Sequence, residues 1–145
     1  MSTATPLPSI VFDASVAIRA SVDRDEEALQ WFVAAERGEV EAVWPELALV
    51  EIAHGLLRLV RGGRLTGADA FSQTARFLAA PVRVEPLGPL ILPALRIAVE
   101  RTLSVYDAAY VVLAESLDAR LVTADRRLAA AAEKSILIGG APPAL

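Results

Sequence analysis

The sequence predicts an α/β fold in which helices cover both faces of a parallel sheet of about five strands. Short apolar runs alternate with longer stretches of helical pattern, which is typical of strands connected by helices. These runs are too short for a helix and apolar enough for strands that are buried on both faces. The expected strands are residues 9–12, 40–44, 82–85, 121–123 and 136–138.

Capping residues mark the ends of the expected helices. Gly38 should end the first helix, and Gly62 with Gly63 should end a long second helix. Thr66 and Asp69 have the spacing of a capping pair that begins the next helix, so the helices on either side of Gly62 should form a hairpin. The expected helices are residues 23–38, 46–61, 66–80, 90–102 and 104–116, with another beginning at 126.

The long helix at 46–61 carries an acid whose position depends on which face is buried. On a helical wheel, Glu51 lies away from the apolar face, near His54 and Arg58, and by pattern alone it is a solvated acid. His54 is the sole His and has no second His or Cys for a zinc site, so we expect it at the surface. The expected apolar face consists of Leu49, Val50, Ala53, Leu56, Leu57 and Val60.

Length and composition limit the class of protein. A chain of 145 residues fits one domain, expected to span 1–145 with flexible ends at 1–8 and 139–145. Cysteine is absent, which excludes disulfides and thiolate chemistry. No apolar run approaches the ~18 residues of a membrane span, and the first residues lack the features of a signal peptide, so we expect a cytoplasmic protein. The formal charge of −4 does not exclude a nuclease whose acids surround a metal ion.

Acidic residues beside the predicted strands are the remaining candidates for chemistry. The sequence has no G-x-G-x-x-G or G-x-x-x-x-G-K-[ST] loop for nucleotides, and no supported Ser–His pair for acyl transfer. Asp13 follows the first strand, Asp125 follows the strand at 121–123, and Asp107 lies at the start of the helix that Ser104 caps. Open parallel sheets bind ligands at the carboxyl ends of their strands. Each acid could instead only cap a helix, so the pattern leaves both interpretations open.

The motifs around these acids resemble those of PIN domains, and among them those of the VapC-type toxin ribonucleases of toxin–antitoxin systems. The resemblance covers nearly the whole chain, residues 10–138. Asp118 replaces the Gly that is usual before the fourth strand, and Asp tolerates the left-handed conformation expected there. The matching motifs are FDAS at 12–15, YDAAYVVLAE at 106–115, LVTAD at 121–125 and, more weakly, PELALVE at 45–51.

The resemblance implies a PIN-like three-layer α/β/α fold with a protruding helical hairpin and with the first strand beside the fourth. Asp13 and Asp125 would then face each other at the topological switch point of the sheet, with Asp107 above them. Glu51 would lean into the same place, which reverses its interpretation from the helical wheel. The catalytic residues that the resemblance implies are Asp13, Glu51, Asp107 and Asp125.

Such a group of carboxylates needs a cation, because like charges in contact raise one another's pKa. Oxygen ligands suit Mg²⁺ or Mn²⁺, and the metal can lower the pKa of a bound water that attacks a phosphodiester. The three aspartates are the expected metal ligands, while Glu51 would bind through water or accept the proton. Ser15 and Thr123 are expected to orient the carboxylates. The number of metal ions stays open.

The resemblance implies a metal-dependent endoribonuclease that inhibits translation until a VapB-like antitoxin neutralises it, and it also implies a homodimer. The RNA substrate, whether tRNA, rRNA or mRNA, stays open. Arg58, Arg61 and Arg64 are candidates for RNA or partner contacts, although a solvated helix face explains them at least as well. A catalytically silent PIN-fold binding or scaffold module is the alternative function. A phosphoacceptor receiver domain is disfavoured because no Lys follows the last strand.

Overall fold

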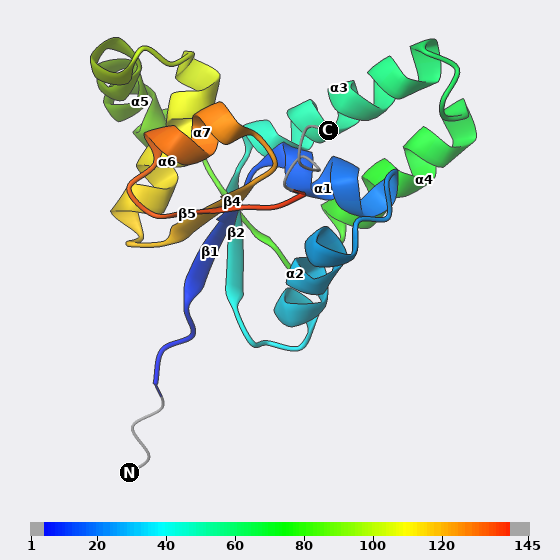
Figure 1. The fold of residues 1–145 in the computed structure, drawn as a ribbon, viewed down its shortest axis with the longest axis horizontal. Helices are drawn as coiled ribbons and strands as arrows, with labels where there is room; N and C mark the ends of the chain where they lie inside the picture. Colours follow the sequence, from blue (N-terminus) through cyan, green and yellow to red (C-terminus); the bar gives the residue numbers. More distant parts are fainter. Residues whose placement is uncertain (1–4, 140–145) are drawn as a thin grey trace, which may run out of the picture.

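The computed structural model describes residues 5–139, in which strands and helices alternate along the chain (Figure 1). The expected flexible ends, 1–8 and 139–145, lie mostly outside the described residues. No helix of the described part is long and apolar enough to cross a membrane. The strands are β1 (Ser9–Phe12), β2 (Glu41–Pro45), β3 (Arg83–Glu85), β4 (Arg120–Thr123) and β5 (Ser135–Leu137). The helices are α1 (Ala14–Ser21), α2 (Glu26–Glu36), α3 (Leu47–Arg61), α4 (Gly67–Leu78), α5 (Gly88–Arg101), α6 (Val105–Ser116) and α7 (Arg126–Ala131).

The five strands form one parallel sheet in the order β3-β2-β1-β4-β5, which confirms the predicted fold class and the placement of the first strand beside the fourth. Val11 in β1 is paired with Val43 in β2 on one side and with Leu121 in β4 on the other. All three side chains are fully buried. The central strands are therefore covered on both faces, as their apolar sequences predict.

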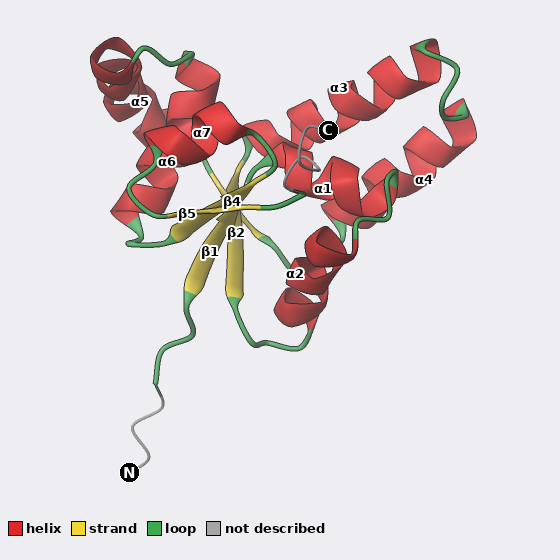
Figure 2. Ribbon diagram, in the orientation of Figure 1, coloured by secondary structure: helices red, strands yellow, loops and turns green. Residues whose placement is uncertain are grey.

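The helices form a layer on each face of the sheet. The chain passes from β1 through β2 to β3 on one side of the sheet, and then crosses back to β4 and β5. Because crossovers between parallel strands are right-handed, the helices after β1 and β2 should cover one face and those after β3 and β4 the other. Figure 2 shows this arrangement, with α1–α4 on one side and α5–α7 on the other. The strand order reverses at β1, so the topological switch point lies between the carboxyl ends of β1 and β4.

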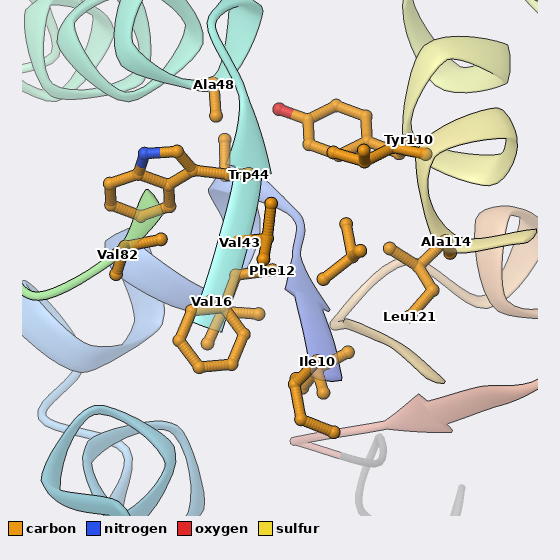
Figure 3. Packing of buried hydrophobic residues seen from close by; sticks show 14 of the residues in the cluster. Ile10, Phe12, Val16, Val43, Trp44, Ala48, Val82, Tyr110, Ala114 and Leu121 are labelled. Atoms are coloured by element: carbon orange, nitrogen blue, oxygen red, sulfur yellow. The ribbon is translucent and has the colours of Figure 1, made fainter. Parts of the chain in front are cut away.

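The core is continuous through both layers (Figure 3). On the α6 side, every residue from Ala108 to Ala114 is buried, as expected for a helix that is apolar almost all round. On the other side, an aromatic cluster packs against the central strands, with the Phe12 and Phe32 ring centroids 5.0 Å apart and Phe77 beside Phe32 at 5.5 Å. This packing fixes the carboxyl end of β1, where Asp13 follows the fully buried Phe12.

The helix expected over 23–38 is confirmed as α2, with shorter ends, whereas α1 (Ala14–Ser21) is a separate helix that the expected set did not include. The two helices are separated at Arg24, which has a φ of 51°. Asp25 rather than Asp23 caps α2, by accepting a hydrogen bond from the Ala28 N–H at 3.0 Å. The sequence gives a weak signal for α1 because its buried positions are mostly alanines. Small side chains allow close packing but produce little contrast in a hydrophobic pattern.

The expected buried face of α3 is partly wrong. Ala48, Ile52 and Leu56 are buried, whereas Val50 is 68% exposed and Leu57 is 39% exposed. The apolar face of this helix is broad, so the wheel alone could not choose which part of it is buried. The choice is made by packing, since α3 contacts β2 and also lies between α1 and α4.

The hairpin of α3 and α4 forms as predicted and extends away from the sheet (Figure 1). Gly62 caps the end of α3, and Gly63 follows in the left-handed region with a φ of 74°. Thr66 begins α4 by accepting a hydrogen bond from the Asp69 N–H at 3.1 Å. The predicted left-handed conformation of Asp118, at the end of α6, is also confirmed by its φ of 50°.

Candidate active site

Asp13 directly follows β1 and has its carboxylate buried at the switch point, with the residue only 8% exposed. It occupies the N-cap position of α1, but its side chain makes no capping hydrogen bond. Its Oδ2 instead accepts hydrogen bonds from the Ser15 hydroxyl at 2.6 Å and the Thr123 hydroxyl at 2.8 Å. The capping interpretation of Asp13 is therefore wrong, and the carboxylate is held by side chains from two separate segments.

Thr123 connects the end of β4 to the end of β1. Its side chain is fully buried, and besides donating to Asp13 its hydroxyl accepts a hydrogen bond from the Asp125 N–H at 2.9 Å. The Ser15 hydroxyl makes a second connection by accepting from the Ala124 N–H at 3.0 Å. One small network of hydroxyls thus fixes both the Asp13 carboxylate and the backbone that leads to Asp125.

Asp125 lies at the other side of the switch point and is exposed. Its Oδ1 accepts hydrogen bonds from the backbone N–H groups of Arg127 at 2.8 Å and Leu128 at 3.3 Å. Asp125 thus caps α7, because its carboxylate stabilises the first turn of this helix. Oδ2 takes no part in this cap.

Glu51 leans toward the other acids from the second turn of α3, which overturns the solvated position that the wheel predicts. The side chain is half-buried, and its Oε1 accepts a hydrogen bond from the Tyr110 hydroxyl at 2.5 Å. Sequence reasoning missed Tyr110. The available signal was its position three residues after Asp107, because residues at this spacing share one face of a helix.

Asp107 lies in the first turn of α6, half-buried, where its backbone N–H donates to the Ser104 hydroxyl at 3.0 Å. Its negative charge acts on both Asp13 and Glu51. Burial is the main cause that raises the pKa of Asp13, with the charge of Asp107 adding to it against the opposing hydrogen bonds from Ser15 and Thr123. The charges of three acids, one directly after β1 and the others on α3 and α6, therefore act on one another.

The pKa of Glu51 is raised by the same combination of causes. Burial contributes most, the hydrogen bond from Tyr110 opposes it, and the charges of Asp13 and Asp107 raise the pKa further. Asp125 is not among the charges that act on Asp13 or Glu51. The structure thus brings Asp13, Glu51 and Asp107 together as an acidic cluster, and places Asp125 at its margin through the Thr123 hydroxyl.

The chemistry of this acidic cluster fits a hard divalent cation, because its donors are all oxygen and their mutual repulsion is relieved by a positive charge. As the side chains are placed, residues 5–139 contain no group of three or more His, Cys, Asp or Glu that is arranged to hold a metal ion. A cation would therefore have to draw the carboxylates closer together. The donor types fit Mg²⁺ or Mn²⁺, whereas the present positions do not form a finished coordination shell.

The three arginines suggested for RNA or partner contacts lie away from the acidic cluster. Arg58, Arg61 and Arg64 are exposed at the outer end of α3 and in the following turn. Arg61 is ten residues beyond Glu51 in the same helix, which corresponds to about 15 Å along the helix axis. Arg64 lies 3.8 Å from Asp23 in an exposed ion pair. Any nucleic-acid contact by these residues would be remote from the acids.

The raised pKa values of Asp13 and Glu51 predict that these acids destabilise the metal-free protein as the pH rises. The folded state holds their protons more tightly than the unfolded chain does. Their stabilising contribution is complete below the ordinary pKa values of 3.8 and 4.5, and it is lost as the pH rises through the folded-state values. Thermal unfolding with a chelator present should show stability falling with pH relative to an Asp13→Asn/Glu51→Gln double variant. Parallel pH profiles for the two proteins would contradict this prediction.

The fold and the acids at its switch point define a class of α/β proteins, and the comparison with known families identifies it. Residues 10–134 match the family model described as PIN domain. The chain therefore belongs to the PIN domain family, which confirms the resemblance seen in its motifs. Ribonuclease VapC9 of Mycobacterium tuberculosis is 42% identical over 119 residues, which cover 82% of this chain and 87% of that protein.

Solved structures agree with this assignment. The crystal structure of PAE2754 from Pyrobaculum aerophilum has a TM-score of 0.74 and 29% sequence identity, with 92% of each chain covered. VapBC2 from Rickettsia felis, bound to a DNA fragment from their promoter, has a TM-score of 0.62 and covers 81% of this chain and 88% of that one. At 12% identity, this second likeness shows the fold alone.

Proposed function

We propose that this chain is a VapC-type toxin, an endoribonuclease that depends on Mg²⁺ or Mn²⁺, hydrolyses phosphodiester bonds in RNA and thereby inhibits translation. The observation that carries the proposal is that Asp13, Glu51 and Asp107, far apart in the sequence, act on one another at the switch point. The 42% identity to Ribonuclease VapC9 supports RNA as the substrate. If these acids only capped helices, none of them would need to lie near another.

Each residue of the site has a role in this proposal. Asp13, Asp107 and the Oδ2 of Asp125 would hold the cation, which when bound lowers the pKa of a water and offsets charge on the phosphate. Ser15 and Thr123 orient the Asp13 carboxylate through their hydrogen bonds to Oδ2. Glu51, whose pKa is raised in part by the charges of Asp13 and Asp107, would accept the proton of the attacking water or hold that water in position.

A direct cleavage assay tests the proposal. Purified protein is incubated with a linear and a circular RNA, with Mg²⁺, with Mn²⁺, and with each metal plus chelator. The proposal requires that the circular RNA is cut, since only an endonuclease can open it, and that chelator stops the reaction. The alternative is a catalytically silent scaffold. It is favoured by the acids of residues 5–139, which are not arranged to hold a metal ion. It requires that neither RNA is cut under any condition.

We further propose that a VapB-like antitoxin neutralises the enzyme. The acidic cluster favours a partner that places a basic side chain among Asp13, Glu51 and Asp107, because such a group would relieve the same repulsion as a cation. Co-expression with the antitoxin should restore growth that the toxin alone arrests. Continued RNA cleavage by the purified complex would contradict this part of the proposal.

The proposed homodimer has a candidate surface on α5. Four apolar side chains of this helix are exposed at helical spacing, at 45%, 75%, 50% and 76% respectively: Ile91, Leu92, Leu95 and Val99. Exposed Arg96 and Glu100 flank this stripe. In a twofold pairing of antiparallel helices, Arg96 of each copy can approach Glu100 of the other.

Replacing Leu95 with glutamate should convert the dimer to a monomer, because it places a charge in the middle of the apolar stripe. Light scattering after size-exclusion chromatography measures the mass directly. Phe71→Glu is the matched control, since Phe71 is exposed on α4 at the far side of the molecule from α5 (Figure 1) and should leave the dimer intact. A monomeric wild-type protein, or a dimeric Leu95→Glu variant, would exclude this interface.

A further inference from the structure

Tyr110 is the one large polar side chain of α6 that lies in the core, beside the acidic cluster. It is fully buried, and its ring extends from α6 toward the sheet with the hydroxyl at the far end (Figure 3). A buried hydroxyl without an acceptor costs about 1–3 kcal/mol, so the identity of its partner matters. That partner is the Oε1 of Glu51, at 2.5 Å.

This hydrogen bond joins the two helical layers. Tyr110 belongs to α6 on one face of the sheet, while Glu51 belongs to α3 on the other, and the two meet beyond the carboxyl ends of the strands. Tyr110 is packed rigidly, whereas a half-buried glutamate side chain still has several accessible rotamers. The rigid Tyr110 phenol therefore fixes the position of the Glu51 carboxylate.

The charges around Glu51 make such a restraint necessary. The carboxylate is half-buried and is repelled by Asp13 and Asp107, and both effects favour a side chain that turns toward water. A phenol donor stabilises the ionised carboxylate and opposes this tendency. Since Oε1 is engaged, Oε2 remains for a water or a proton.

We propose that Tyr110 is a positioning residue that holds Glu51 in place for the cleavage of RNA. The inference rests on the proposed ribonuclease function and assigns a role to a residue outside the acidic cluster. Tyr110 does not touch the substrate in this role and acts only through Glu51. Its removal should therefore slow the chemical step without weakening the binding of RNA.

The test replaces Tyr110 with phenylalanine, which keeps the ring and removes the donor. We expect kcat to fall by about tenfold or somewhat more, the size typical of losing a supporting hydrogen bond, with KM unchanged. Tyr106→Phe is the matched control, because Tyr106 lies on the same helix, is 64% exposed and should leave both constants unaltered. In a Glu51→Gln background, Tyr110→Phe should cause no additional loss, since the residue through which it acts is already disabled.

A second measurement uses the metal-free protein and no substrate. The tyrosine doublet in ultraviolet resonance Raman spectra reports hydrogen bonding by the phenol, and the chain has only two tyrosines. Comparison with Tyr110→Phe isolates the Tyr110 signal, which should change to that of a weaker donor in Glu51→Gln. An unchanged signal would overturn the inference, because the hydrogen bond would then be absent.

The kinetic outcomes separate this inference from the function on which it rests. If the wild-type protein cleaves RNA and Tyr110→Phe matches it, the positioning role is wrong and the ribonuclease function stands. Equal losses from Tyr110→Phe in the wild-type and Glu51→Gln backgrounds would also refute a role exerted through Glu51. A wild-type protein that cleaves no RNA would refute the proposed function, and the positioning role with it.

Discussion

Asparagine in place of Asp13 or Asp107 should lower the rate of RNA cleavage by roughly 10²–10³-fold, the cost of removing one electrostatic group from a reaction centre. Both substitutions keep the size of the side chain and remove its charge. At Asp13 the amide oxygen can still accept a hydrogen bond from Ser15 or Thr123, so the local network should survive. Initial rates on a labelled RNA, with saturating Mg²⁺ or Mn²⁺, measure the effect.

Asp118→Asn is the matched control for these variants. Asp118 follows α6 at the amino end of β4, the opposite edge of the sheet from Asp13, and asparagine also tolerates its left-handed backbone. This control should cleave RNA at the wild-type rate. Because burial raises the pKa of Asp13, the Asp13→Asn variant should unfold at neutral pH with chelator at the same temperature as the wild type or higher. Wild-type cleavage by Asp13→Asn and Asp107→Asn would refute the proposed site.

Valine in place of Thr123 should reduce cleavage by about 10–100-fold and destabilise the fold by about 1–3 kcal/mol. The Thr123 hydroxyl donates to Asp13 and accepts from the Asp125 N–H, so valine removes one restraint from each side of the switch point. The side chain is fully buried, and water cannot easily take the place of the hydroxyl. Cleavage rates and urea unfolding measure the two effects.

The controls for this prediction are Thr123→Ser and Thr74→Val. Serine keeps the hydroxyl and should recover most of the activity that valine loses. Thr74 makes a hydrogen bond only within α4, to the Ala70 carbonyl at 2.8 Å, so valine there should leave cleavage unchanged. If Thr123→Val cleaves within twofold of the wild type, or if serine fails to recover activity, the hydroxyl does not position the site.

Much of the site could be anticipated from local sequence because it lies where strands end. Asp13 and Asp125 directly follow short buried strands, and Asp107 lies in the first turn of a helix that Ser104 caps. The ends of strands and helices depend mainly on nearby residues, and parallel strands bring their carboxyl ends to one edge of the sheet. The capping question could not be answered in the same way. Asp13 and Asp125 occupy similar N-cap positions, yet only Asp125 caps its helix, because Ser15 and Thr123 engage Asp13 instead.

The amino-acid order was enough to define the strands and most helix ends, since each depends on short-range pattern and capping. It also named Asp13, Asp107 and Asp125 as candidates, without deciding between a cap and a site. The burial of Glu51 and its hydrogen bond with Tyr110 depend on how α3 and α6 pack across the sheet from opposite layers. The apolar face of α3 is broader than the surface that its neighbours cover, and its own sequence does not choose which part is buried. Contacts between residues 59 positions apart make that choice, because only the packed layers bring them within reach.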